Sequence, residues 1–432
     1  MINGSRKRIL LIMGLVVCLC AAQGFGLSRR AQDIAQDQIY RSLSMKPQPV
    51  GSAKQISGAA LPADKDDDGM PDSWEKANGF NPADPNDAWL DTDKDGVVNL
   101  FEYQLGSGPK HAATPPIVTV GTSGGEDYTD LEDALDNAAL GSCIRVAGGT
   151  YKVNYMTFDL AVVMIQGGWN ADFTVRNLKT YQTVLDGSSS ADDEVLYFSF
   201  TSGNPVVILD GLKIINGKGY FGAVNILAQT KAFLKSSIFN CLLVKSGGDS
   251  DHAGVLYFNS WGSSLSDRTI ANTVCAGNTA SGIYAQVTDS AKARWRIIHS
   301  AIAKNTNGGG DNGFGIEAFT LGTGNLKTHI FNSILWGNAQ KDIYIHSSNI
   351  VFNVDHTDLN KVLAEYGAKC NLGAGNLNKD PKFVSPSKAD FHLKSTSPVI
   401  NKGLKKGMPT IDFEGDKRVK GAAPDMGPDE VK

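Results

Sequence analysis

The sequence predicts an all-β fold, a solenoid of the parallel β-helix type, and three observations support that prediction. Glycine is frequent, with 47 residues, and together with Asn and Ser it favours many tight turns. Short apolar segments recur at steps of 24 to 33 residues, a length that suits one solenoid coil with variable loops. Polar residues six positions apart flank these segments.

Composition excludes several other classes of protein. Of the 432 residues, 41% are hydrophobic and 20% are charged, which excludes a disordered chain. No internal apolar run is long enough to cross a bilayer, and the glycines have no G-X-Y period, so collagen is excluded as well. We expect a soluble, monomeric protein.

Residues 1–26 are predicted to be a signal peptide. A basic triplet at residues 6–8 precedes an apolar run at residues 9–22, which has the length of a secretory h-region. Cys18 weakly matches a lipobox, so a lipid anchor and an uncleaved membrane anchor stay open. Residues 27–62 are polar and indicate a flexible spacer. The expected location is secreted, periplasmic or at the cell surface.

The negative charge is concentrated in one segment. The formal charge of −4 becomes −7 without the basic triplet, and residues 64–102 hold twelve acidic residues and three lysines, a net −9. The rest of the mature chain has no basic surface of the kind that binds nucleic acid. Four cysteines lie outside the signal, and their spacing does not show whether they pair: Cys143, Cys241, Cys275 and Cys370.

Residues 63–110 are predicted to bind Ca²⁺ through two twelve-residue loops of EF-hand spacing. Ca²⁺ takes six to eight hard oxygen ligands, and alternate side chains of a tight loop converge on one point. Gly69 at the sixth position permits the sharp turn. The first ligand set is Asp64, Asp66, Asp68, the Met70 carbonyl, Asp72 and Glu75.

The second loop repeats this pattern 27 residues later. Its ligands are Asp91, Asp93, Asp95, the Val97 carbonyl, Asn99 and Glu102. The alternative is a solvated acidic linker, but such a run has no reason to reproduce a ligand register twice. The segment resembles bacterial thrombospondin type 3 and dockerin-like repeats. The resemblance implies a structural spacer or docking element beside a carbohydrate-active or surface domain.

A short amphipathic helix is expected next, before the repeats. Thr129-Asp130-Leu131-Glu132 forms a capping box, and Gly141 ends the segment. Leu131 and Ala134 share one face of this helix, which would cover the open end of the first coil.

The repeats are predicted to turn at polar corners. Asn tolerates left-handed φ, and its amide can bond the equivalent residue of the next coil. The corner pairs are Asp186 with Asp192, Asp210 with Asn216, Asn240 with Ser246, Asn272 with Asn278, His299 with Asn305, and Asn332 with Asn338. Further strands begin at Gly222, Gly254, Gly282, Gly315 and Asp342. A β-propeller and an array of β-sandwiches are the competing folds, and neither predicts single-strand repeats at these steps.

Residues 117–400 resemble the right-handed parallel β-helix proteins of the pectate-lyase-like superfamily, and residues 116–375 are predicted to form the β-helix itself. The resemblance rests on Asp133-Ala134-Leu135, Ile144-Arg145-Val146, Gly149-Thr150-Tyr151, Gly167-Gly168-Trp169 and Thr183-Val184-Leu185-Asp186-Gly187. Residues 376–432 resemble the C-terminal region of such proteins and are expected to cap the last coil. The superfamily contains polysaccharide lyases, glycoside hydrolases and noncatalytic surface proteins, so the fold does not settle function.

No catalytic set can be assigned from the sequence. Val354-Asp355-His356 resembles a segment of pectate lyases, but no Arg-x-Pro-x-x-Arg motif accompanies it. Arg294 and Arg296 would share one face of a strand and could meet an anion, although a solvated face is the simpler interpretation. Loop polarity alone explains the acidic clusters at residues 249–252 and at Asp311.

One outward column is the candidate glycan-binding surface. The residues two positions after each strand start are Val224, Leu256, Tyr284, Glu317 and Tyr344. Tyr rings pack on the apolar face of sugars, and Glu317 could accept hydrogen bonds from hydroxyls. A register error of one residue would send the column inward.

The leading functional hypothesis is a secreted or cell-surface calcium-binding β-helix protein that engages polysaccharide, with or without degrading it as a lyase or hydrolase. The alternative is a noncatalytic structural or adhesion protein. In that case the calcium segment serves as a stiff spacer.

Overall fold

The computed structural model describes residues 60–110, 115–153, 156–158, 161–189, 194–219, 221–248, 253–308 and 311–431, which all belong to one compact unit. The expected signal peptide, nearly all of the spacer, Asp192 and residues 249–252 lie outside these residues. Among the residues described, no helix has the length and apolar character that a membrane span requires.

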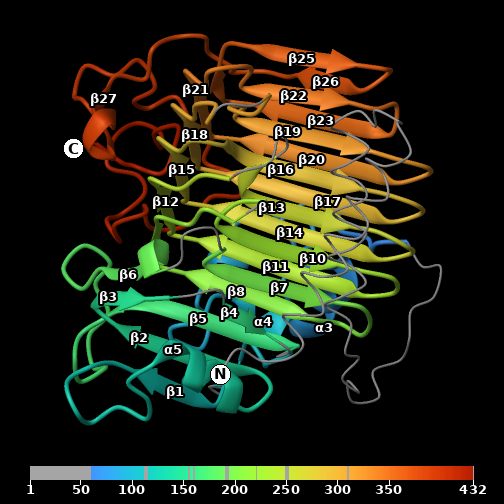
Figure 1. Ribbon diagram of the computed structural model, residues 1–432. Helices are drawn as coiled ribbons and strands as arrows, with labels where there is room; N and C mark the ends of the chain where they lie inside the picture. The colour runs from blue at the N-terminus through green and yellow to red at the C-terminus, as the bar shows by residue number, and fades with distance from the viewer. Residues whose placement is uncertain are drawn as a thin grey trace, which may run out of the picture. The chain divides into compact units, whose positions relative to one another are not determined.

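Successive coils stack on one another, and their equivalent strands form three parallel sheets, as Figure 1 shows. We call them the ten-stranded sheet, the tail-side sheet and the tyrosine sheet, and each complete coil visits them in that order. β8, β9 and β10, for example, pair in parallel with β11, β12 and β13 of the next coil. This arrangement confirms the prediction of an all-β, right-handed parallel β-helix.

The ten-stranded sheet contains β1 (Ile117–Val120), β2 (Ser142–Ala147), β5 (Val162–Trp169), β8 (Val206–Asp210), β11 (Phe233–Phe239), β14 (Leu265–Ala271), β17 (Lys292–Ile298), β20 (Asn325–Phe331), β23 (Ile350–Asp355) and β26 (Lys369–Leu372). The tail-side sheet contains β3 (Gly149–Lys152), β6 (Thr183–Asp186), β9 (Leu212–Ile215), β12 (Leu242–Val244), β15 (Val274–Ala276), β18 (Ala301–Ala303), β21 (Ile334–Trp336) and β24 (Asp358–Leu359).

The tyrosine sheet contains β4 (Met156–Phe158), β7 (Leu196–Phe200), β10 (Val224–Ala228), β13 (Gly254–Ser260), β16 (Ser281–Val287), β19 (Ile316–Thr320), β22 (Ile343–His346) and β25 (Val362–Glu365). The remaining elements are α3 (Asp72–Asn78), η1 (Asp87–Trp89), α4 (Asn99–Leu105), α5 (Leu131–Asn137), η2 (Gly187–Ser189), η3 (Pro386–Lys388) and an antiparallel pair, β27 (Phe383–Ser385) with β28 (Asp390–Leu393).

The predicted polar corners are confirmed where the ten-stranded sheet turns into the tail-side sheet. Asn240, Asn272 and Asn332 have φ between 50° and 52°, in the left-handed region that Asn tolerates. The Asn240 amide donates to Asp210 Oδ1 at 3.0 Å, and the Asn272 amide donates to Asn240 Oδ1 at 3.1 Å. Amides therefore link successive coils along this corner.

A second ladder follows the end of the tail-side strands. The Asn278 amide donates to Asn305 Oδ1 at 3.0 Å, and the Asn305 amide donates to Asn338 Oδ1 at 3.1 Å. Asp186 belongs to this second ladder, because it ends β6 and accepts from the Asn216 amide at 2.8 Å. Its assignment to the first ladder was wrong, since Asp186 lies at the far end of its strand.

The expected capping helix is α5, but its N-cap is Asp130 rather than Thr129, and it ends at Asn137, before Gly141. The Asp130 side chain accepts from the backbone N–H groups of Glu132 and Asp133, and Leu131, Ala134 and Leu135 are buried in the interior cluster. The helix covers the interior beside β1 and β2, at the first coil (Figure 1).

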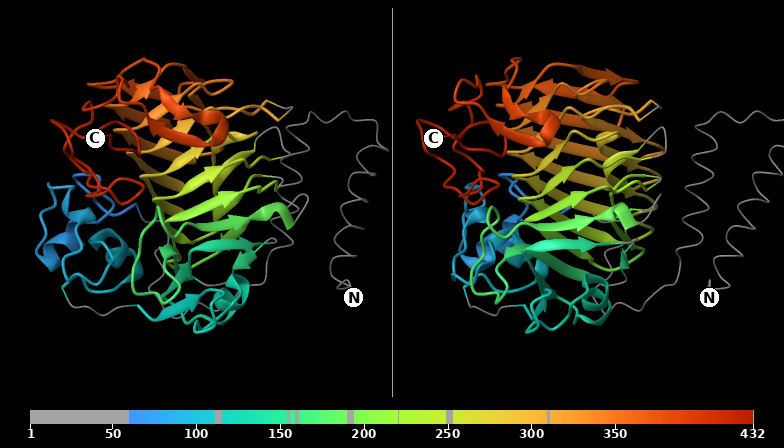
Figure 2. Two further views of the ribbon diagram at one scale, coloured as in Figure 1. Left: turned by 90° about the vertical axis from the view of Figure 1, so that its left-hand side faces the viewer. Right: turned by 60° about the vertical axis from the view of Figure 1, so that its left-hand side comes forward.

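Flanking segments cover two outer faces of the β-helix. The N-terminal segment, residues 63–110, packs Met70, Trp89 and Phe101 on the outward face of the ten-stranded sheet. The C-terminal tail, residues 376–431, packs on the outward face of the tail-side sheet. Figure 2 shows the tail beside the coils, so the expectation that it caps the last coil is wrong. Its apolar residues match the small outward side chains of β15 and β18, which lie along the side of the solenoid.

The four cysteines are free thiols in the structure, and Cys143, Cys241 and Cys275 are buried. Burial raises the pKa of the Cys241 thiol to about 12, as expected for a small apolar core residue.

Candidate calcium-binding segment

The first predicted loop closes around its own carboxylates. Asp64 accepts the backbone N–H groups of Asp68 and Gly69 at 3.2 and 3.1 Å, and Asp68 accepts that of Met70 at 2.7 Å. Gly69 has φ of 105°, and a Cβ there would lie 2.8 Å from Leu100 Cδ1. Only glycine combines this backbone conformation with so close an approach.

Two carboxylate clusters share Asp68. The side-chain oxygens of Asp64, Asp66 and Asp68 lie within 4.8 Å of one another, and so do those of Asp68, Glu75 and Asp87. Asp87 was missed by sequence reasoning, because it lies outside the twelve-residue register, on the turn η1. The Asn81 backbone N–H donates to Asp87 Oδ2 at 3.1 Å, which fixes this carboxylate against the loop.

Six buried carboxylate oxygens in these clusters have no hydrogen-bond partner among the described residues. They are Asp66 Oδ1 and Oδ2, Asp68 Oδ2, Glu75 Oε1 and Oε2, and Asp87 Oδ1. Buried polar atoms are almost always paired, because leaving one unpaired costs about 1–3 kcal/mol and more for a charge. Clustered hard oxygens without partners are the ligands that Ca²⁺ prefers, so the donor set fits that ion.

The raised pKa values of the clustered carboxyl groups also fit a cation site. Burial, together with neighbouring carboxylates, raises the pKa of Glu75 to about 8 and that of Asp66 to about 6. Burial raises the pKa of Asp68 to about 9. With no cation present, Glu75 and Asp68 favour the protonated form near neutral pH, whereas a divalent cation would stabilise the charged form.

The second loop has the same internal hydrogen bonds but is more open. Asp91 accepts from the Gly96 backbone N–H at 3.0 Å, and Asp95 accepts from that of Val97 at 2.9 Å. The oxygens of Asp91, Asp93 and Asp95 also cluster within 4.8 Å. Its buried unpartnered oxygens are Asp93 Oδ2, Asn99 Oδ1 and Glu102 Oε2, three where the first loop has six.

The remaining predicted ligands lie close to these clusters. Asp72 begins α3 and accepts from the Lys65 backbone N–H at 2.8 Å, which draws the two ends of the first loop together. Asn99 begins α4, and its amide donates to the Asp87 main-chain carbonyl at 2.7 Å, so the second loop is joined to the turn that carries the added carboxylate. Met70 and Val97 are buried at the seventh positions.

Two arginines attach the first loop to β17. Arg296 is 1% exposed and its guanidinium contacts Asp64 Oδ2 at 2.6 Å, Asp67 Oδ1 at 3.0 Å and Asp267 Oδ1 at 2.6 Å. Arg294 also contacts Asp267 and reaches Asp64 Oδ2 at 3.3 Å. The interpretation of a solvated arginine face was wrong, because acidic residues distant in sequence fold back over it.

Apolar contacts hold the same segment on the ten-stranded sheet. Trp89 stacks on Phe239 with ring centroids 5.4 Å apart, and Phe101 meets the same ring edge-on at 5.6 Å. The Lys235 ammonium lies 4.5 Å from the centroid of the Tyr103 ring. The segment is therefore a packed part of the β-helix rather than a separate spacer.

The five residues of the predicted glycan column do not share one strand register. Val224 and Leu256 align with Ile283 and belong to the interior cluster, because the strand starts do not share one register. Tyr284, Glu317 and Tyr344 do align with one another across three coils. Tyr284 stacks on Tyr257 outside the interior cluster, with centroids 5.3 Å apart.

Accessibility limits this column as a binding surface. Tyr284 and Glu317 are each 2% exposed, so neither offers a face to a glycan in this conformation. Tyr344 is half-buried, and its hydroxyl donates to Glu365 Oε2 at 3.0 Å.

Comparisons with known proteins concern the fold alone. No family model and no curated protein matches the chain. Among solved structures, the crystal structure of pectate lyase Pel9A is similar, with a TM-score of 0.39 and 14% identity, over 74% of this chain and 97% of that chain. At this level of likeness, the comparison carries no argument about activity.

Proposed function

We propose that the chain is an exported, calcium-binding β-helix protein that engages polysaccharide. Calcium would be structural, and it would fix the N-terminal segment on the ten-stranded sheet. The observation that carries the proposal is the set of six buried, unpartnered carboxylate oxygens around Asp68.

Asp66, Asp68, Glu75 and Asp87 are the residues that would hold the ion in the first loop, with Asp64 at its edge. Bound Ca²⁺ supplies two positive charges that offset the mutual repulsion of these carboxylates. Asp64 Oδ2 faces Arg296 at 2.6 Å, so the guanidinium stabilises the outer side of the same carboxylate cluster. Binding and docking of the segment would therefore reinforce each other.

Calorimetry on the chelator-treated protein tests the calcium part of this proposal. We expect two binding events, with the first loop binding more tightly than the second. Absence of binding at millimolar calcium would remove the proposal. Magnesium serves as the control ion, because it demands near-ideal octahedral geometry and keeps several waters.

The glycan part is tested with a panel of acidic and neutral polysaccharides, with calcium and with chelator. Binding is expected to require calcium. Mass spectrometry of the same samples distinguishes the chemistry, since unsaturated products indicate a lyase and saturated products a hydrolase. Binding without products favours an adhesion protein, which is the second candidate. The adhesion hypothesis is favoured by the extensive apolar docking of residues 63–110 on the ten-stranded sheet, since such docking suits a structural role for this segment.

A further inference from the structure

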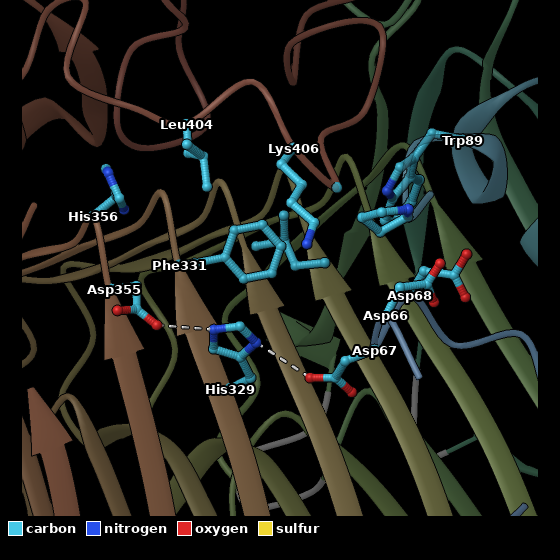
Figure 3. Close-up of a pocket in the computed structure, with 13 residues that line it drawn as sticks. Asp66, Asp67, Asp68, Trp89, His329, Phe331, Asp355, His356, Leu404 and Lys406 are labelled. Carbon is cyan, nitrogen blue, oxygen red and sulfur yellow. Dashed lines mark hydrogen bonds and ion pairs between the residues drawn. The ribbon is translucent and has the colours of Figure 1, made fainter. Parts of the chain in front are cut away.

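A cavity of about 240 Å³ lies where the N-terminal segment and the tail meet above the ten-stranded sheet. Figure 3 shows side chains from all three parts around it. The Gly407 backbone N–H donates to Asn86 Oδ1 at 2.9 Å, which joins the two flanking segments beside the cavity. Its lining includes His329, Phe331 and Asp355 from the sheet, Trp89 from the N-terminal segment, and Leu404 and Lys406 from the tail.

The polar floor of the cavity is held in place by ion pairs. His329 Nδ1 lies 3.2 Å from Asp67 Oδ2, and its Nε2 lies 3.3 Å from Asp355 Oδ2 (Figure 3). Burial would lower the pKa of His329, but the hydrogen bonds to both carboxylates outweigh burial and raise it. The two carboxylates are therefore held in place, and one imidazolium does not offset both of their negative charges.

Hydrogen-bond donors at the edges of the cavity have no partner within the described part of the chain. Trp89 is 2% exposed and its indole N–H is unpartnered. His356 Nδ1 is also buried and unpartnered. Lys406 is exposed and forms no ion pair with the residues described, and Figure 3 shows its ammonium extending toward Phe331. These donors surround an aromatic face, which is the chemistry that recognises a sugar ring.

We propose that this cavity binds a single uncharged pyranose unit of a glycan. Phe331 and Leu404 would contact the apolar face of the ring, while Trp89, His356 and Lys406 would donate to its oxygens. The volume lies below the roughly 300–1,000 Å³ typical of drug-sized ligand sites, so one ring fits and a chain segment does not. Asp67 and Asp355 share the single imidazolium of His329, so their remaining negative charge disfavours an acidic sugar. Asp66 and Asp68 also line the site, but bound calcium would offset their charge.

The inference deepens the proposed function, because it assigns the polysaccharide contact to this cavity rather than to the tyrosine sheet. Asp66 and Asp68 belong both to its wall and to the calcium clusters. Calcium in the first loop would therefore shape the wall, and sugar binding is expected to depend on calcium.

The test uses the full mature chain and methyl glycosides of glucose, galactose, mannose, N-acetylglucosamine and glucuronic acid. Saturation-transfer NMR and calorimetry measure binding, with calcium and with chelator. Lys406→Met keeps the aliphatic stem and removes the charge, so we expect at least about tenfold weaker binding of the neutral glycoside. The matched control is Lys405→Met, an exposed neighbour outside the cavity, for which affinity should not change.

Trp89→Phe gives a second readout, because it keeps an aromatic ring and removes only the indole donor and some volume. Some loss of Tm is expected because Trp89 packs on Phe239. Weaker glycoside binding by this variant at a temperature where it stays folded would support the cavity. Glycoside binding that neither variant alters would overturn the inference and leave the proposed function standing. Preference for glucuronic acid would overturn the uncharged class. Calcium binding without any glycoside binding would overturn the inference while leaving the calcium site intact.

Discussion

The two flanking segments pack on neighbouring faces of the same β-helix but balance their charges differently. In the tail, Glu414 contacts Lys179 at 2.7 Å and His392 at 3.1 Å, so cations of the chain itself meet the carboxylate. In the N-terminal segment, the carboxylates around Asp68 face one another and leave oxygens unpartnered. Apolar packing alone thus does not complete a docked segment. For the N-terminal segment, the proposed calcium ion would supply the missing positive charge.

The largest effect is expected at the joint between the N-terminal segment and β17. Arg296→Ala leaves buried Asp64 and Asp267 without their main counter-charge. Removing one partner of a buried ion pair costs about 3–5 kcal/mol. Denaturant unfolding measures this cost, and Lys292→Ala, exposed on the same strand, is the control, expected within about 0.5 kcal/mol of wild type. A loss below about 1 kcal/mol for Arg296→Ala would mean that the ion pairs do not hold the segment.

Calcium removal should speed hydrogen exchange in the N-terminal segment but not in the tail. At free calcium a hundredfold above Kd, binding stabilises the folded segment by about 2.7 kcal/mol. Hydrogen exchange of the α4 amides should therefore accelerate by about a hundredfold in chelator, whereas the amides of β27 and β28 should not change. Equal acceleration in both segments would contradict the comparison.

The first loop should contribute more to calcium binding than the second loop. Within the described part of the chain, Glu75 has two buried oxygens without a partner and Glu102 has one. Glu75→Gln should weaken calcium binding by at least about tenfold, since even changes outside the direct ligands cost 10–100-fold, and Glu102→Gln should have a smaller effect. Calorimetry on both variants decides, and an inverted order would show that the open loop is the principal site.

The tail should respond to pH instead of calcium. Hydrogen bonding to Glu414 raises the pKa of His392 to about 9, above its ordinary value of 6.5. A raised folded-state pKa means that the contribution is fully present below about pH 6.5 and is lost as pH rises through about 9. Denaturation midpoints of wild type and His392→Gln should therefore converge across this window. Parallel curves would exclude a role for this imidazolium, which salt also screens because the side chain is partly exposed.

The smallest effect is expected on the tyrosine sheet. Tyr344→Ala removes the least buried member of the column, and aromatic contacts of this kind contribute about 0.5–1.5 kcal/mol. Because the glycan contact is assigned to the cavity, glycan affinity of Tyr344→Ala should match that of the exposed control Tyr366→Ala. A larger loss here than at Lys406 would move the binding surface to this sheet.

The corners, the strands and the closure of the two acidic loops could be predicted because their causes are local. Left-handed φ selects Asn at a corner, as at Asn272, and the loop ligands follow a fixed spacing that begins at Asp64. The predicted column loses its register at Tyr284, because the number of residues from the turn glycine to the start of the strand differs between coils. Counting from a turn cannot reveal that shift.

The missed features depend on contacts between distant parts of the chain. Asp87 joins Asp68 only after the segment folds, and Arg296 meets Asp64 across 232 residues. The path of the tail beside the coils is fixed by packing on the small outward residues of β15 and β18, which read in the sequence as ordinary core positions. No short-range pattern encodes the cavity, because three separate segments build it.

The N-terminal segment spans the outward side chains of many coils, from Cys143 on β2 to Phe331 on β20. A solenoid can gain or lose a coil with little local disturbance, since each coil contacts only its neighbours. The overlying N-terminal segment fits only one number of coils beneath it. A duplicated or deleted coil would place Arg296 out of reach of Asp64, so the number of coils beneath the segment is expected to be held constant through evolution while the end near β26 can vary.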